Sequence, residues 1–179
     1  MPPLIVTDSS YEFIPPHQGH IWPRLLSRFA TRVIRTRYGI QTVEIREQQK
    51  LATLLAAGHS ILLAPNHCRM SDAMVLQSLS QSLRQPFFVM ASSHLFRGSR
   101  LLKWALRRMG AFSIYREGVD RRAVEAAVEL LAAGKRPLVL FPEDEPMESR
   151  PASRHFLERA MCVIEDLDPR SALREFAGL

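Results

Sequence analysis

Apolar residues along the chain alternate between two spacings. Short apolar runs, which are typical of buried strands, occur at residues 61–65, 86–92, 111–115 and 137–143, and the alternating segment 42–46 predicts a further short strand. Between them, apolar positions three or four residues apart predict helices at residues 22–38, 47–58, 71–84, 94–110 and 121–135. Strands that alternate with helices predict an α/β fold: a single layered domain with a mostly parallel central sheet flanked by helices.

The regular pattern occupies the middle of the chain. Residues 1–20 contain four prolines and no lasting period, which predicts an irregular N-terminal arm, and the α/β domain is expected over residues 21–143. Residues 144–179 are predicted to form a polar tail with one candidate helix at 155–167 and no further strand. This leaves open a sheet that is incomplete at its C-terminal side.

Composition and charge limit the classes of protein and of binding partner that fit the sequence. A hydrophobic content of 46% in 179 residues excludes a disordered chain and fits about one domain. The net charge of +6 is unevenly spread, because residues 143–179 carry 9 acidic and 5 basic side chains, which leaves +10 on residues 1–142. A basic body favours an anionic partner: a membrane surface, nucleic acid, or a phosphorylated molecule such as coenzyme A or an acyl carrier.

The chain predicts a cytoplasmic protein without a metal site. It has no apolar run near the roughly 18 residues that a membrane-spanning helix needs, and its first residues resemble neither a secretory signal nor a transit peptide. Cys68 and Cys162 are far apart, which indicates reduced thiols. The histidines other than His67 are scattered without the spacing of metal ligands.

The loop after the strand at 61–65 carries a pair of residues suited to proton transfer. His67 and Asp72 are five positions apart, about 140° on a continuous helix, so they meet only if His67 lies in the loop and Asp72 in the first helical turn. A carboxylate bonded to imidazole fixes its tautomer and leaves the other nitrogen free to act as a general base. Alternatively, His67 caps a turn and Asp72 merely stabilises the helix N-terminus.

Two further motifs end the next predicted strands. GAFSIYR at 110–116 ends in Arg116, and FPE at 141–143 follows it. In this order and spacing, these motifs and NHCRMSD at 66–72 resemble the glycerolipid acyltransferase family, which includes lysophosphatidate and glycerol-3-phosphate acyltransferases. The resemblance covers about residues 60–143.

The resemblance implies a reaction and a role for each motif. His67 would deprotonate an acceptor hydroxyl with Asp72 as its orienting partner, and the hydroxyl would attack the thioester of acyl-CoA or an acylated carrier protein. The second motif, with Gly110, implies that Arg116 grips the phosphate of a glycerol-phosphate or lysophospholipid acceptor. The alternative for Arg116 is a surface ion pair with Glu117 or Asp120. The reaction needs no cofactor and belongs to phospholipid synthesis.

The third motif matches the family only in part. Phe141, Pro142 and Glu143 match and are implied to shape the acceptor site, but Asp144 stands where the family has glycine. Asp144 restricts the backbone and adds negative charge near the expected phosphate. A fourth family block, a strand rich in valine and proline, is absent. These departures favour an alternative, an inactive or truncated paralogue that binds lipid or acyl-CoA without catalysis.

The basic helices leave the partner open. The helix at 22–38 either lies on an anionic membrane surface with Trp22, Leu25 and Phe29 inserted, or packs on the sheet with its arginines in solvent. On the helix at 94–110, Arg97, Arg100 and Lys103 either remain in solvent or meet coenzyme A or an acyl carrier protein. No nucleic acid is expected, because reading motifs are lacking. The expected location is the cytoplasm, peripheral on the inner face of the membrane.

Overall fold

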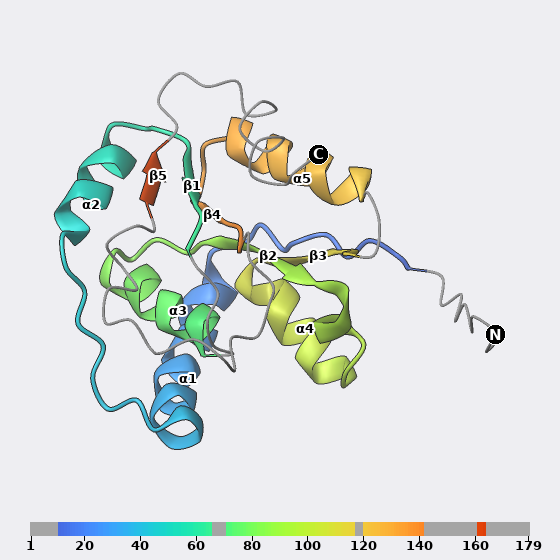
Figure 1. The fold of residues 1–179 in the computed structure, drawn as a ribbon, viewed down its shortest axis with the longest axis horizontal. Helices are drawn as coiled ribbons and strands as arrows, with labels where there is room; N and C mark the ends of the chain where they lie inside the picture. Colours follow the sequence, from blue (N-terminus) through green and yellow to red (C-terminus); the bar gives the residue numbers. More distant parts are fainter. Residues whose placement is uncertain (1–10, 66–70, 117–119, 142–160, 164–179) are drawn as a thin grey trace, which may run out of the picture.

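The structure is a computed structural model that describes residues 11–65, 71–116, 120–141 and 161–163. Within these ranges the strands form one five-stranded sheet in the order β3-β2-β4-β1-β5 (Figure 1). The strands are β1 (Ile61–Leu63), β2 (Phe88–Ser92), β3 (Ala111–Ile114), β4 (Leu138–Val139) and β5 (Met161–Val163). The first four are mutually parallel, whereas β5 pairs antiparallel with β1. The predicted α/β class with a mostly parallel sheet is confirmed.

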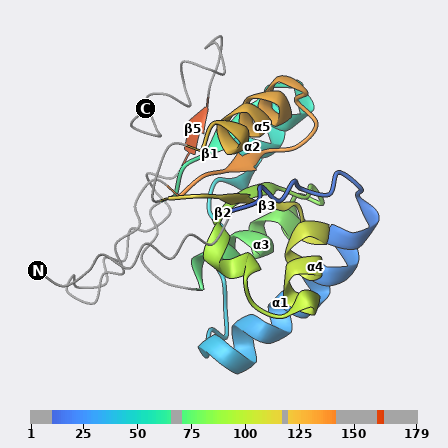
Figure 2. The same ribbon diagram turned by 90° about the vertical axis from the view of Figure 1, so that its right-hand side faces the viewer.

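Helices cover both faces of the sheet (Figure 2). On one face lies α5, and on the other α3 and α4, with α1 packed against α3 and α4 from outside. A 3₁₀ helix, η1, connects β2 to α4, and α2 packs Leu51 against β1. The helices are α1 (Ile21–Tyr38), α2 (Gln48–Ala56), α3 (Asp72–Ser82), η1 (Ser93–Phe96), α4 (Arg100–Met109) and α5 (Arg121–Ala132).

The core consists of two clusters, one on each face of the sheet. Successive residues of β1 and β4 enter opposite clusters, as expected for strands buried on both faces. The first cluster includes Leu62, Phe88, Met90, Phe112, Ala127, Leu130, Leu131, Leu138 and Leu140, and the second Leu51, Ile61, Leu63, Leu76, Phe87 and Val139.

Three expected elements differ from the structure. Residues 42–46 form no strand, because none of their side chains is buried and no neighbouring strand pairs with them. The helix expected at 94–110 is divided into η1 and α4, because Ser99 begins a new helix by accepting a hydrogen bond from the Leu102 N–H at 3.2 Å.

The third difference concerns the end of the chain. Residues 161–163 form β5 beside β1. At these residues the expectation of a helix over 155–167 was therefore wrong, and so was the expectation that no further strand follows residue 143. A short apolar run is compatible with either a helix or a strand. Here the run forms a strand because it pairs with β1, which has no other neighbour on that side. The sheet therefore extends beyond the four parallel strands.

The described part of the N-terminal arm lies along β3. Residues 11–19 form no helix or strand, but the Ser113 N–H donates to the Ile14 carbonyl at 3.1 Å, and the Ile14 N–H donates to the Ser113 hydroxyl at 2.8 Å. The Phe13 ring packs edge-on against Phe112, with 6.4 Å between centroids. The arm thus covers an edge of the sheet that would otherwise present unpaired backbone groups.

Gly110 joins α4 to β3 at a position that only glycine fits. Its φ is +100°, and a Cβ atom there would lie 2.7 Å from the Phe87 carbonyl oxygen. Gly58, after α2, has a φ of +82°, but a Cβ atom at that position would meet no other atom within 4 Å. Both glycines have a left-handed backbone conformation, but only at Gly110 does another backbone atom lie too close for a side chain.

We predict that Gly110→Ala lowers the free energy of unfolding more than Gly58→Ala. The positive φ alone costs roughly 1–2 kcal/mol, and shifting the Phe87 carbonyl adds about 1–3 kcal/mol at Gly110. Urea unfolding of both variants measures the difference. Equal losses would show that the close approach at Gly110 carries no energetic weight.

Candidate active site

The candidate site lies where the parallel strands end. Because β1 to β4 run in one direction, their carboxyl ends form one edge of the sheet, here called the carboxyl edge, and their starts form the amino edge. Asp72 follows β1, Arg116 follows β3 and Phe141 follows β4, so the structure brings these three predicted residues to the carboxyl edge. Ligand sites of open α/β sheets lie at this edge.

Asp72 is a buried carboxylate at a helix N-terminus. It is the first residue of α3 and only 5% exposed. The preceding Ser71 carbonyl accepts the N–H groups of Met74 and Val75, each at 2.9 Å, so α3 begins here. A carboxylate in the first turn is stabilised by the positive end of the helix dipole. His67 lies outside the described residues, so its pairing with Asp72 stays a prediction.

Arg116 follows Tyr115 at the end of β3, where the Asp120 side chain joins Tyr115 to the start of α5. One Asp120 carboxylate oxygen accepts the Tyr115 N–H at 2.9 Å, and the other accepts the Ala123 N–H at 3.1 Å, which caps α5. Arg116 is exposed overall, but partial burial of its guanidinium lowers its pKa. A partly desolvated cation thus lies at the carboxyl edge.

Tyr11, in the N-terminal arm, contacts the end of β3 beside Arg116. Its ring stacks on Tyr115, with 5.3 Å between centroids, and its hydroxyl bonds with the Ser113 hydroxyl at 2.8 Å. Burial, with a smaller contribution from Asp120, raises the pKa of Tyr11 to about 12. Neither Tyr11 nor Ser113 carries a local sequence signal, because their contact joins an irregular arm to a distant strand.

The strand order sets the width of the site. Because β2 and β4 lie between β3 and β1, three strand spacings of about 4.8 Å separate the end of β3, next to Arg116, from the end of β1 by about 14 Å. The end of β2 lies between these two strand ends, and there Ser92 is followed by buried Ser93 and exposed His94. In the sequence His94 is one of the scattered histidines, although its place after a buried strand could have marked it.

The other predicted residues are distributed differently. Phe141 is partly buried against the second core cluster and anchors the segment after β4, whereas Pro142 and Glu143 lie outside the described residues. Gly110 lies at the amino edge, at the opposite end of β3 from Arg116. Backbone geometry alone accounts for glycine there, and a contact between Gly110 and substrate stays a prediction.

The structure defines an α/β protein with polar segments gathered at the carboxyl edge of a parallel sheet. A family model described as Acyltransferase matches residues 42–162. The match covers more than half of the chain, so the protein belongs to the acyltransferase family. It confirms the resemblance found in the sequence and extends beyond residues 60–143 to include part of β5. No curated protein and no solved structure matches the chain.

Two features are absent from the described part of the chain. None of its helices has the length and apolar character needed to cross a membrane. Within the same ranges, no three histidine, cysteine, aspartate or glutamate side chains gather in a way that could hold a metal ion.

The Tyr11 contact predicts a dependence of stability on alkaline pH. Because the pKa of Tyr11 is raised from 10.0 to about 12 in the folded protein, its contribution is fully present below pH 10 and is lost as the pH rises through 12. Tyr11→Phe should unfold more easily near neutral pH, by about 1 kcal/mol for the lost hydrogen bond, and should lose less stability than the wild type on going to alkaline pH. Urea unfolding at several pH values measures this, and parallel curves would contradict it.

Proposed function

We propose that the protein transfers a fatty acyl group from acyl-CoA, or from an acylated carrier protein, to a hydroxyl of a glycerol-phosphate or lysophospholipid acceptor in phospholipid synthesis. The observation that carries this proposal is that Asp72 and Arg116, each from a different family motif, lie at one edge of the sheet. Membership of the acyltransferase family supports the reaction class. No metal or cofactor takes part in the proposed chemistry.

His67 and Asp72 would move the proton. The His67 imidazole takes the proton of the acceptor hydroxyl, and Asp72 accepts a hydrogen bond from the other ring nitrogen and stabilises the imidazolium. The hydroxyl oxygen forms a bond to the thioester carbonyl carbon, and the C–S bond then breaks. The leaving thiolate takes the proton from His67, which restores the base. Burial of Asp72 supports this role, because a carboxylate interacts more strongly with imidazolium where water is excluded.

Arg116 would bind the acceptor. A guanidinium grips a phosphate through two parallel hydrogen bonds, and the long side chain of Arg116, after the end of β3, would reach toward an acceptor held near Asp72. Phe141, Pro142 and Glu143 would shape the acceptor side of the site, next to β1. Gly110 would act indirectly, by fixing the start of the strand that ends at Arg116.

A second candidate function keeps the fold without the catalysis. Asp144, in place of the motif glycine, favours a paralogue that binds lipid or acyl-CoA but transfers nothing. In that case purified protein would bind acyl-CoA and release no free thiol. We propose a cytoplasmic protein that is peripheral on the inner face of the membrane, where its lipid acceptor and product reside.

Removing the base should abolish transfer. We expect His67→Ala to lower kcat by about 10²–10⁴-fold, the usual contribution of a general base, and Asp72→Asn to lower it less. The measurement is release of free coenzyme A from acyl-CoA, followed with a thiol reagent. His59→Ala is the matched control, because His59 precedes β1 at the amino edge. Transfer that survives His67→Ala in a folded protein would refute the assignment of the base.

Changing the phosphate contact should affect acceptor binding. Arg116→Ala is expected to raise the KM for acceptors that carry a phosphate monoester by more than it lowers kcat. Arg116→Lys should restore only part of the affinity, because an ammonium cannot form the paired contact. Initial rates over a range of acceptor concentrations separate the two constants. An increase in the KM of the acyl donor instead would place Arg116 on the donor side.

A further inference from the structure

The pattern of burial on α1 is the reverse of that expected for a helix packed on a domain. It buries its small residues Pro23, Ser27 and Ala30, together with Ile34. Its larger apolar residues Ile21, Leu25 and Phe29 are 73%, 47% and 66% exposed. These three are spaced four apart and therefore form one stripe along the helix, here called the apolar stripe. A contiguous exposed apolar surface marks an interaction site.

Trp22 does not belong to the apolar stripe. Its ring contacts Trp104 of α4 edge-on, with 4.9 Å between centroids, and the Arg108 guanidinium lies 5.5 Å from the Trp22 centroid. Trp22 therefore attaches α1 to α4, which corrects the expectation that it inserts together with Leu25 and Phe29. The attachment fixes which face of α1 is turned outward.

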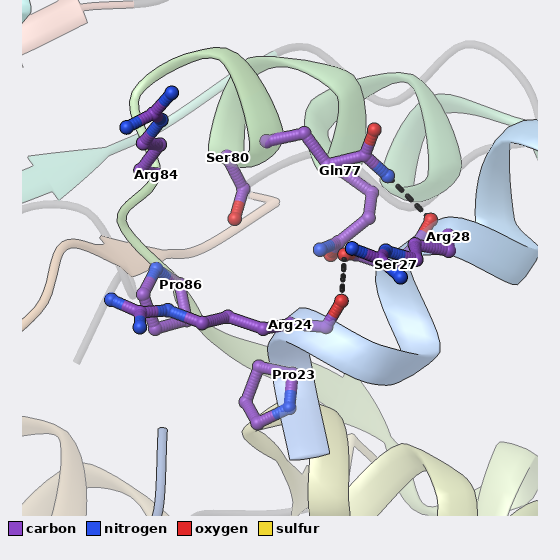
Figure 3. A pocket seen from close by; sticks show the side chains of 9 residues that line it. Pro23, Arg24, Ser27, Arg28, Gln77, Ser80, Arg84 and Pro86 are labelled. Carbon is purple, nitrogen blue, oxygen red and sulfur yellow. Dashed lines mark hydrogen bonds between the residues drawn. The ribbon is translucent and has the colours of Figure 1, made fainter. Parts of the chain in front are cut away.

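Arginines on α1 border a pocket of about 470 Å³ between α1 and the end of α3 (Figure 3). Ser27 and Ser80, both buried, lie among its lining residues, and their hydroxyls donate to the carbonyls of Arg24 at 2.9 Å and Gln85 at 2.8 Å. None of the lining residues is acidic. They are Pro23, Arg24, Ser27, Arg28, Gln77, Ser80, Gln81, Arg84 and Pro86.

Arg84 occupies a strained position at this pocket. Its φ is +52°, and it lies in the turn that ends α3, where the Arg84 N–H donates to the Gln81 carbonyl and the Gln85 N–H to the Ser80 carbonyl, each at 3.1 Å. Glycine is the residue favoured at such a helix end. Arg84 thus stands where glycine is favoured, and its side chain lines the pocket.

The positive charge around the pocket has no carboxylate partner among the ion pairs of the described residues. Those pairs, Arg46 with Glu44 and Lys50 with Glu47, are formed elsewhere. The pKa of nearby His20 is lowered by burial and then by Arg136, Arg24 and Lys135, so further cations surround the same region. Such a concentration of cations favours an anionic ligand.

We propose that this pocket binds the phosphate of an anionic phospholipid headgroup, while the apolar stripe enters the membrane beside it. Arg24 and Arg28 precede Leu25 and Phe29 directly, about 100° apart on the helix, so the cations flank the apolar stripe as in helices that lie in a membrane interface. The pocket lies near the start of β2, at the amino edge, and is distinct from the candidate active site. The proposal does not depend on acyl transfer.

Sedimentation with vesicles tests the proposal. Wild-type protein should bind vesicles of phosphatidylcholine mixed with phosphatidylglycerol, and should not bind phosphatidylcholine alone. Arg24→Gln and Arg28→Gln should each weaken binding about fivefold, and Phe29→Gln should weaken it too. Arg84→Gly is the sharpest variant, because it should weaken binding about fivefold while the protein melts at the same temperature or higher.

Two control variants separate the pocket from other cations. Arg122→Gln, on α5 across the sheet, should change binding by less than about twofold. Arg116→Ala should bind vesicles as the wild type does, which distinguishes the pocket from the candidate active site. Binding that is equal in Arg84→Gly and wild type would overturn the pocket as the headgroup site.

Two other outcomes would also overturn the proposal. If inorganic phosphate at constant ionic strength binds with the same dependence on Arg24 and Arg84, while anionic vesicles do not bind, the pocket serves a free phosphate ester. If the protein alone forms dimers that Phe29→Gln dissociates, and vesicles do not bind, the apolar stripe is an interface between two copies of the chain.

Discussion

Parallel pairing of β1 to β4 is the constraint on which the rest of the molecule depends. It sends every connection from the carboxyl edge back across a face of the sheet, and so collects the segments of Asp72, Arg116 and Phe141 at one edge. The strands are short, and β4 has only two residues, so buried side chains must hold the register. Leu62 and Leu138, which are paired across β1 and β4, are both fully buried. A shift by one residue would exchange the two core clusters.

The two edges of the sheet have different characters. The carboxyl edge carries Asp72 at the start of α3, and Arg116 next to Tyr115, which the arm and Asp120 contact. The amino edge is cationic: Arg136 is buried, its guanidinium lies 4.8 Å from the Phe88 ring centroid, and it donates to the Gln18 carbonyl. Burial lowers the pKa of Arg136. An enzyme with a lipid acceptor could use such a division, with chemistry at one edge and an anionic surface recognised at the other.

Sequence alone predicted the elements whose signals are local. The apolar runs at β1 to β3 and the helical spacing of α1, α3 and α5 appear in the structure close to their expected bounds, whereas only two residues of the run at 137–143 form β4. The strand at 42–46 failed because alternation shows only that a strand could form, and pairing requires a neighbour. The sequence also missed β5 and the contact of Tyr11, because each depends on which distant segment lies beside it. For the candidate site, the motifs predicted that Asp72, Arg116 and Phe141 share an edge, but the order of the strands that carry them depends on long-range pairing.

Release of free coenzyme A from acyl-CoA by purified, folded wild-type protein, with and without a panel of acceptors, tests the central claim most directly. The panel comprises glycerol 3-phosphate, lysophosphatidate and lysophospholipids that lack a phosphate monoester. The account predicts release that depends on the acceptor, is strongest with a phosphate monoester, and yields the acylated acceptor. Release without any acceptor, or none from protein that melts cooperatively, would contradict it.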